Sequence, residues 1–219
     1  MHRVQIAVYG AGGFGREVAW LAEACSTPEA VYEVVCFIED NAALLGQTIN
    51  DIPVLSLIEA RERFPGALVA GGVGSPRTRQ IIMEKAAGAS FRFATLVHPR
   101  VECSRWVEIG EGAVICAGNI LTVNIVLGRH VQINLDCTIG HDVVMGDFTT
   151  LAPGVHVSGW VHCGQRVYMG TGAVILNGTE DSPLTIGDDA VVGAGAVVTR
   201  SVPPGVTVVG VPARPLQRG

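Results

Sequence analysis

Residues 109–144 read IGEGAV-ICAGNI-LTVNIV-LGRHVQ-INLDCT-IGHDVV, and every block of six opens on Ile or Leu. The phase continues to residue 176, so that twelve consecutive blocks open on a branched or other apolar residue. A repeat this short cannot bury its apolar face alone and must stack on copies of itself. The sequence therefore predicts a solenoid in which the opening residues point inward.

A longer period of 18 residues runs through the same stretch, because a glycine returns at Gly110, Gly128, Gly146 and Gly164. Three blocks of six therefore make one coil. A triangular coil explains both periods: each side is a short strand, and each corner is a tight turn in which glycine tolerates a positive φ. We expect corner residues to lie on the outside of the coil.

Composition restricts the class of protein. A length of 219 residues suits one large domain or two small ones, and a net charge of −5 argues against a nucleic-acid partner. No stretch approaches the ~18 apolar residues of a membrane helix. Six cysteines lack CxxC spacing, which favours reduced thiols and a cytoplasmic location. Cys103 and Cys163 fall on inward-pointing positions of the repeat.

The chain is predicted to have two domains, a small α/β Rossmann-like domain over residues 1–93 and the solenoid over residues 94–219. Apolar runs and helical patterns alternate in the first part, which indicates a parallel sheet that binds ligands at the carboxyl ends of its strands. The expected strands are 4–9, 32–38 and 67–70, and the expected helices are 16–25, 57–63 and 76–86, with a short segment at 52–54 leading into the second helix. Within the solenoid, the next opening after Ile175 is Ile186, so five residues are inserted within 177–185.

A glycine loop, GAGGFG at residues 10–15, lies between the first strand and the first helix. Its G-x-G-x-x-G spacing in this context predicts a phosphate site made by backbone N–H groups and the helix N-terminus. Ninety-three residues supply little sheet for a full dinucleotide domain, so a mononucleotide or nucleotide-sugar is the favoured ligand. The alternative is a tight turn that needs glycine for geometry only. The predicted contacts are Gly10, Gly13, Phe14, Asp40 and Gly72.

The repeat blocks IGEGAV, INLDCT, IGDDAV and VGAGAV resemble those of the hexapeptide-repeat acyltransferases, which are left-handed parallel β-helices. The left hand is implied by this resemblance alone, since parallel strands ordinarily connect by right-handed crossovers. Residues 203–214, PPGVTVVGVPAR, are similar to the end of these enzymes, which lines the coenzyme A groove. Together with the glycine-loop domain, the whole chain resembles the sialic acid O-acetyltransferase and bacillosamine N-acetyltransferase family.

The resemblance implies that His141 is the general base and that Asp142 orients it, with Asn134 contacting the substrate. Adjacent side chains on a strand point to opposite faces, so the pair requires a turn between them, which a corner of the coil can supply. This family often has a second histidine nine residues after the first. Here that position is Thr150, a departure that leaves one hydroxyl to contact acetyl-CoA.

Acetyl-CoA is the co-substrate that the resemblance implies, bound along the solenoid between two chains. Its expected contacts are Thr150, Gly159, Gly170 and Thr171, with Pro212 and Arg214 near the nucleotide end. Because His141 lies on an outer face of the coil, a single chain supplies only one side of the site. We therefore expect a homotrimer, in which neighbouring chains complete three equivalent sites.

The predicted function is acetyl transfer from acetyl-CoA to an amino or hydroxyl group of a free or nucleotide-linked sugar, without a metal. Two alternatives stay open. One is a non-catalytic trimeric scaffold built on the same solenoid. The other is a metal-dependent hydratase of the carbonic anhydrase type, suggested by His130, His156 and His162, although their spacing differs from that of its zinc ligands.

Overall fold

The computed structural model describes residues 2–216, which divide into two compact units at residues 99 and 100. The sequence had suggested a boundary between residues 93 and 94. The two units are described separately below.

The first unit is a six-stranded sheet with helices, in the strand order β3-β4-β2-β1-β5-β6. All neighbouring strands are parallel except β3, which is antiparallel to β4. The elements are β1 (His2–Tyr9), α1 (Gly13–Ala24), β2 (Ala30–Ile38), the 3₁₀ turn η1 (Ala42–Leu44), β3 (Thr48–Ile49), β4 (Ile52–Leu55), α2 (Leu57–Arg63), β5 (Leu68–Gly71), α3 (Pro76–Gly88) and β6 (Arg92–Phe93).

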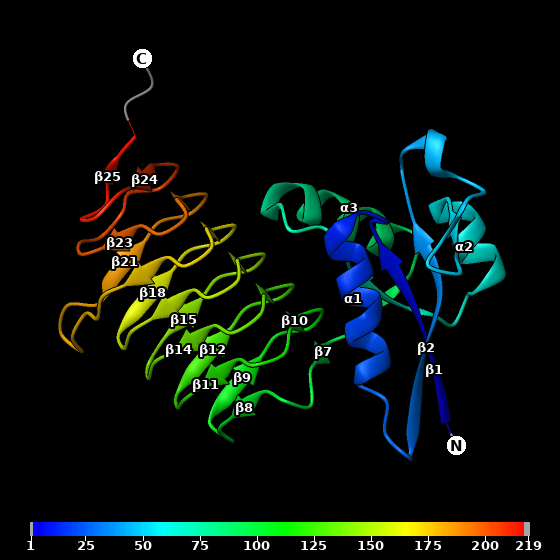
Figure 1. The fold of residues 1–219 in the computed structure, drawn as a ribbon, viewed down its shortest axis with the longest axis horizontal. Helices are drawn as coiled ribbons and strands as arrows, with labels where there is room; N and C mark the ends of the chain where they lie inside the picture. The colour runs from blue at the N-terminus through cyan, green and yellow to red at the C-terminus, as the bar shows by residue number, and fades with distance from the viewer. Residues whose placement is uncertain (1, 217–219) are drawn as a thin grey trace. The chain divides into compact units, whose positions relative to one another are not determined.

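The strand order reverses at β1, which lies between β2 and β5. In parallel sheets of this kind the carboxyl ends of the strands beside such a reversal form the ligand crevice. Gly10 follows β1 and Gly72 follows β5, so both lie at that edge. In Figure 1, α1 and α2 flank the strands on opposite sides, as two crossovers that run in opposite directions require.

The second unit is a left-handed parallel β-helix, whose stacked coils are visible in Figure 1. Its sides are three sheets. The eight-stranded sheet begins with β7 (Leu96–Val97), just before the division at residues 99 and 100, and continues with β10 (Val114–Ile115), β13 (Gln132–Ile133), β16 (Thr150–Leu151), β19 (Tyr168–Met169), β22 (Val191–Val192), β24 (Thr207–Val209) and the antiparallel β25 (Arg214–Pro215). The six-stranded sheet contains β8 (Glu102–Cys103), β11 (Ile120–Leu121), β14 (Thr138–Ile139), β17 (His156–Val157), β20 (Val174–Ile175) and β23 (Val197–Val198). The five-stranded sheet contains β9 (Val107–Ile109), β12 (Ile125–Leu127), β15 (Val144–Met145), β18 (Val161–Cys163) and β21 (Leu184–Ile186).

The opening residues of the repeat form the core, as the sequence predicted. Ile115 pairs with Ile133 and Ile139 pairs with Val157, each 18 residues further on, and these side chains are buried. The expectation for Cys103 was wrong: it is exposed because β8 is the terminal strand of its sheet and has a neighbour on one side only.

The inserted residues form a small loop closed by two backbone hydrogen bonds between Thr179 and Ser182. After it, β21 pairs with β18 so that Leu184 lies opposite Val161, 23 residues earlier instead of 18. The insertion of five residues is therefore confirmed, and the helix continues without a change of register on its inner face.

Two corners of the coil matter for function. The 141 corner joins the six-stranded sheet to the five-stranded one and consists of residues 122–124, 140–142 and 158–160 in successive coils. The 171 corner joins the eight-stranded sheet to the six-stranded one and consists of residues 134–136, 152–154 and 170–172. At the 141 corner the third residue of each turn is left-handed, with φ of 55° at Asn124, 57° at Asp142 and 56° at Trp160.

Candidate active site

His141 and Asp142 form a hydrogen-bonded pair at the 141 corner. The His141 Nδ1 atom lies 2.8 Å from Asp142 Oδ2, and the imidazole is 53% exposed. The left-handed turn at Asp142 brings two adjacent side chains to the same side, which an extended strand would not do. The contact predicted from the sequence is therefore confirmed, and it leaves Nε2 as the ring nitrogen open to a reactant.

Asn124, one coil earlier, holds the other oxygen of the same carboxylate. Its Nδ2 donates to Asp142 Oδ1 over 3.0 Å. The hydrogen bond from His141 and then that from Asn124 lower the pKa of Asp142 below its ordinary value. Asp142 is therefore a carboxylate at neutral pH and accepts the Nδ1 proton of the imidazole.

The next coil confines the imidazole from above. A Cβ atom at Gly159 would lie 2.5 Å from both Cε1 and Nε2 of His141, so only glycine leaves room for the ring. The Trp160 ring meets the imidazole edge to face, with centroids 6.2 Å apart and planes at 84°. Tryptophan is unusual at a positive φ, where glycine, Asn and Asp are common. The His141 imidazole is thus positioned by residues of three consecutive coils.

At some corners of the coil a side-chain oxygen accepts a hydrogen bond from the backbone N–H equivalent to that of Gly159: Asp147 from Arg129, Asp188 from Gln165, and Asn134 from Leu135, over 2.8–2.9 Å. At others, such as Val123 and His141 of the 141 corner and Thr171 of the 171 corner, this N–H has no acceptor within residues 2–216. Within residues 2–216, no group accepts a hydrogen bond from the Gly159 N–H, although the residue is buried. A buried donor without an acceptor is costly, and a ligand oxygen would satisfy it.

Of the predicted coenzyme contacts, Gly159 lies beside His141 at the 141 corner, whereas the others lie elsewhere on the coil. Gly170 and Thr171 are at the 171 corner, together with the predicted substrate contact Asn134, on the opposite edge of the six-stranded sheet from His141. Thr150 is 5% exposed in β16 of the eight-stranded sheet. A single solenoid therefore does not bring these residues to His141.

The carboxyl-terminal cap holds the two remaining predicted contacts. Arg214 and Arg200 line one pocket of about 250 Å³, together with apolar residues such as Val198 and Val208. Pro212 lies two residues before Arg214 in the same cap, which β25 closes against β24. Two guanidinium groups at one pocket can bind a phosphate.

The glycines of the first unit have two different roles. Gly10, Gly15 and Gly72 pack directly on one another: a Cβ atom at Gly15 would collide with the Gly10 carbonyl oxygen, and one at Gly72 would lie 2.8 Å from that same oxygen. Gly10 also has a φ of +110°. For these three residues, close packing of helix against strand explains the glycine.

Gly12 and Gly13 have no such steric reason, since a Cβ atom at Gly12 would meet nothing within 4 Å and one at Gly13 only Arg16, at 3.9 Å. Gly12 is the N-cap of α1 and supplies no side-chain cap, and the first turn contains no acidic residue. Phe14, also in that turn, is half-buried. The loop amide of Ala11 is already occupied, because it donates to Glu39 Oε2 over 3.2 Å.

Asp40 lies at the end of β2 in a cluster that the sequence did not reveal. Tyr9 donates its hydroxyl proton to Oδ1 over 2.8 Å, and Lys85 of α3 bonds Oδ2 at 2.6 Å. The bond from Lys85, the larger effect, and that from Tyr9 lower the pKa of Asp40. Burial and this carboxylate raise the pKa of Tyr9. Asp40 is therefore ionised and fixed in orientation, and about half of its side chain remains exposed.

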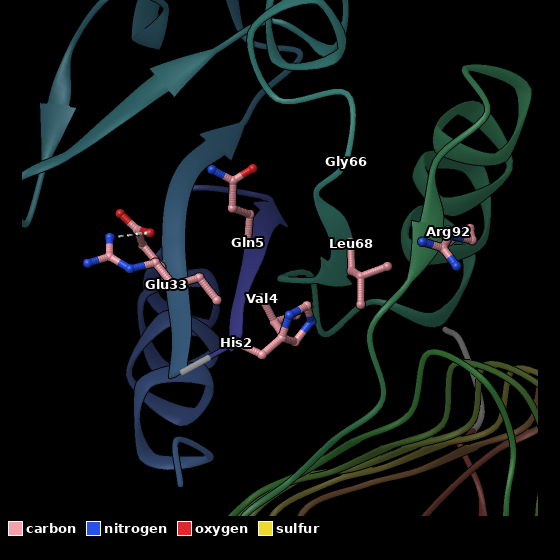
Figure 2. A pocket seen from close by; sticks show the side chains of 8 residues that line it. His2, Val4, Gln5, Glu33, Gly66, Leu68 and Arg92 are labelled. Atoms are coloured by element: carbon pink, nitrogen blue, oxygen red, sulfur yellow. Dashed lines mark hydrogen bonds and ion pairs between the residues drawn. The ribbon is translucent and has the colours of Figure 1, made fainter. Parts of the chain in front are cut away.

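A separate pocket of about 600 Å³ lies near the amino-terminal ends of the strands, away from the glycine loop (Figure 2). Arg3 and Glu33 form an ion pair of 3.4 Å at its side. None of the predicted site residues lines it. The lining residues are His2, Arg3, Val4, Gln5, Glu33, Gly66, Leu68 and Arg92.

The residues behind the hydratase alternative do not assemble. His130 is 4% exposed and stacks on Phe148 with ring centroids 4.9 Å apart, whereas His156 bonds Thr138 at 2.8 Å on the six-stranded sheet. Residues 2–216 contain no group of three or more His, Cys, Asp or Glu side chains arranged to hold a metal ion. In the same residues, none of the helices has the length and apolar character needed to span a membrane.

Comparison with known proteins decides the family. GDP-perosamine N-acetyltransferase of Escherichia coli O157:H7 is 32% identical over 217 residues, which cover 96% of each chain. The chain belongs to the hexapeptide-repeat sugar acetyltransferase family. The PglD N-terminal domain family matches residues 5–86. The family resemblance drawn from the repeat and the glycine loop is thus confirmed, as is the enzyme class, acyltransferase, and the scaffold alternative is set aside.

Solved structures of this family agree over the full length. WeeI from Acinetobacter baumannii AYE has a TM-score of 0.89 and 38% identity, covering 98% of this chain and 100% of its own. The acetyltransferase domain of PglB from Neisseria gonorrhoeae FA1090, in complex with acetyl coenzyme A, has a TM-score of 0.86, 33% identity and coverage of 98% and 100%. PerB from Caulobacter crescentus, in complex with CoA and GDP-perosamine, has a TM-score of 0.83, 28% identity and coverage of 97% of each chain. These complexes support acetyl-CoA as the co-substrate in the family.

Proposed function

We propose that this protein transfers the acetyl group of acetyl-CoA to the amino group of a nucleotide-linked amino sugar. The observation that carries the proposal is the His141–Asp142 pair beside the unsatisfied N–H of Gly159. Acyl transfer from a thioester needs a base for the nucleophile and a donor for the oxyanion. Both groups lie at one corner, in adjacent coils.

The reaction proceeds by direct attack. The amine nitrogen forms a bond to the thioester carbon while His141 Nε2 takes one proton from it, and Asp142 stabilises the resulting imidazolium. The carbonyl oxygen gains negative charge and accepts a hydrogen bond from the Gly159 N–H. When the C–S bond breaks, the imidazolium returns its proton to the leaving CoA sulfur, so that the enzyme ends in its starting state.

The donor site is proposed to lie between two subunits of a homotrimer. The coenzyme contacts Gly170 and Thr171, with the substrate contact Asn134, occupy one edge of the six-stranded sheet and His141 the other, so a neighbouring solenoid must bring a second edge to the base. Cyclic symmetry then makes three equal sites. Thr150 and Pro212 are assigned to the coenzyme channel, and Arg214 to a coenzyme phosphate. Light scattering should report a trimer, and a fully active monomer would refute this arrangement.

The acceptor site is proposed to lie at the glycine loop of the first unit. The amides of Gly13 and Phe14 at the uncapped start of α1 would hold the diphosphate, and Gly10 and Gly72 shape the loop around it. Asp40 would accept hydrogen bonds from the ribose or base. The CoA and GDP-perosamine complex of PerB, with its matched fold, supports a nucleotide-linked acceptor.

Asp40→Asn should raise the acceptor KM by about tenfold, the effect of losing one hydrogen bond to a charged group. The KM for acetyl-CoA should stay nearly unchanged. Asparagine is preferable to alanine here because it keeps an acceptor for the buried Tyr9 hydroxyl. Lys85→Met removes the same ion pair but keeps the carboxylate, so it separates the two effects. Equal increases in both KM values would count against the assignment.

The function itself is tested by thiol release from acetyl-CoA with purified protein and a panel of GDP-, UDP- and dTDP-linked amino sugars, with and without a chelator. Rapid release with one nucleotide-linked amine, and none with its hydroxyl analogue, is the expected result. Chelator-sensitive activity or acetylation of free sugars alone would overturn the proposal. A cytoplasmic location is proposed with it, consistent with six free cysteines.

A further inference from the structure

We infer that Asn124 is a positioning residue for the transfer: it fixes the Asp142 carboxylate, which in turn fixes the His141 base. This inference rests on the proposed function. Asn124 lies 18 residues before Asp142, directly beneath it in the preceding coil. Its amide donates to Oδ1 over 3.0 Å, while Oδ2 bonds the imidazole at 2.8 Å.

The two hydrogen bonds together lock the carboxylate. With Oδ2 alone engaged, the carboxylate could rotate about its Cβ–Cγ bond and present either oxygen. A second bond to Oδ1 from a different coil removes that freedom. The plane of the carboxylate then sets the orientation of the Nδ1–H, and therefore the direction of the Nε2 lone pair.

Solvent makes this second bond necessary. The imidazole is 53% exposed and the Asp142 side chain 23%, so water competes for their contact. Exposed pairs of this kind contribute little when they stand alone, because holding two side chains in one geometry is entropically unfavourable. A neutral amide donor restrains the carboxylate without neutralising its charge, which the imidazolium requires during the reaction.

The alternative role for Asn124 is purely structural, since asparagine tolerates the φ of 55° that the turn has at this position. Glycine tolerates that backbone equally well. Asn124→Gly therefore keeps the turn and deletes the amide. Asn50 is a matched control: it is an exposed asparagine with φ of 49° in the turn between β3 and β4, so Asn50→Gly makes the same change away from the site.

The test measures kcat and both KM values from pH 5 to 9 for wild type, Asn124→Gly, Asn124→Asp, Asn50→Gly and His141→Ala. Asn124→Gly should lower kcat on the order of tenfold, the loss of one hydrogen bond to a charged group, with both KM values nearly constant. Asn124→Asp should also shift the acidic limb of the kcat profile to higher pH, because a second negative charge favours the imidazolium. Among residues 2–216, His141 is the titratable side chain bonded to Asp142. Asn50→Gly should match wild type.

The outcomes separate the two proposals. If His141→Ala is inactive but folded Asn124→Gly keeps wild-type kcat, the positioning role is wrong and the proposed function stands. If His141→Ala retains activity, the proposed mechanism itself fails. Should Asn124→Gly melt far below wild type, kcat measured at a temperature at which the variant is folded decides, since a residue that only stabilises the turn would then leave kcat unchanged.

Discussion

Replacing His141 by alanine should lower kcat by roughly 10²–10⁴-fold, the usual contribution of a general base. The KM for acetyl-CoA should change little, because the imidazole contacts the attacking amine and not the coenzyme. The wild-type rate should rise with pH, since both the imidazole and the amine acceptor must be unprotonated for attack. The measurement is steady-state thiol release across pH, with the concentration of acetyl-CoA varied so that both kcat and its KM are obtained.

The alanine variant should keep its fold and assembly, because the side chain is on the outside of the coil and 53% exposed. Thermal unfolding and light scattering check this. A folded variant with more than about half of the wild-type kcat would show that His141 is not the base.

Gly159→Ala should lower kcat by about 10²-fold, the cost of a small misplacement of a catalytic group. The added methyl would lie 2.5 Å from two atoms of the imidazole ring and must displace it. The φ of Gly159 is not in the left-handed region, so alanine fits the backbone, and its N–H remains in place. The loss should therefore come from the displaced base.

The double variant His141→Ala/Gly159→Ala isolates that cause. Without an imidazole the methyl has nothing to displace, so the double variant should be no slower than His141→Ala alone. If the second substitution still costs the same factor, the methyl acts on the substrate or the oxyanion donor, and the steric account is incorrect.

The sequence predicted the solenoid well because one physical rule produces it. Every sixth residue must be apolar to stack on its counterpart in the next coil, so the residue types along the sequence identify the inward and outward positions directly. The insertion before Ile186 appears as a break in this six-residue period. The same rule placed His141 outside. It failed for Cys103, since the rule assumes a coil on both sides and β8 has only one.

Side-chain partners across turns were harder to predict. Asn124 and Trp160 share the 18-residue spacing of Asp142, which was visible in the sequence, but their contacts depend on left-handed turns at all three positions. The pairing of Asp40 with Lys85 joins residues 45 apart, through a helix whose placement no local pattern specifies. The glycines of the loop also differ from one another in a way that only the surrounding atoms show: Gly15 is closely packed, whereas Gly13 has open space around it.

The stacking of the site along the helix axis also defines the smallest unit that can be transplanted. Asn124 comes from one coil, His141 and Asp142 from the next, and Gly159 and Trp160 from a third. Each coil of a solenoid contacts only its neighbours. A chimera that receives residues 122–160 as one segment would carry His141 together with the residues that position it. Exchange of the middle coil alone would transfer the histidine without Asn124 of the preceding coil and without Gly159 and Trp160 of the following one.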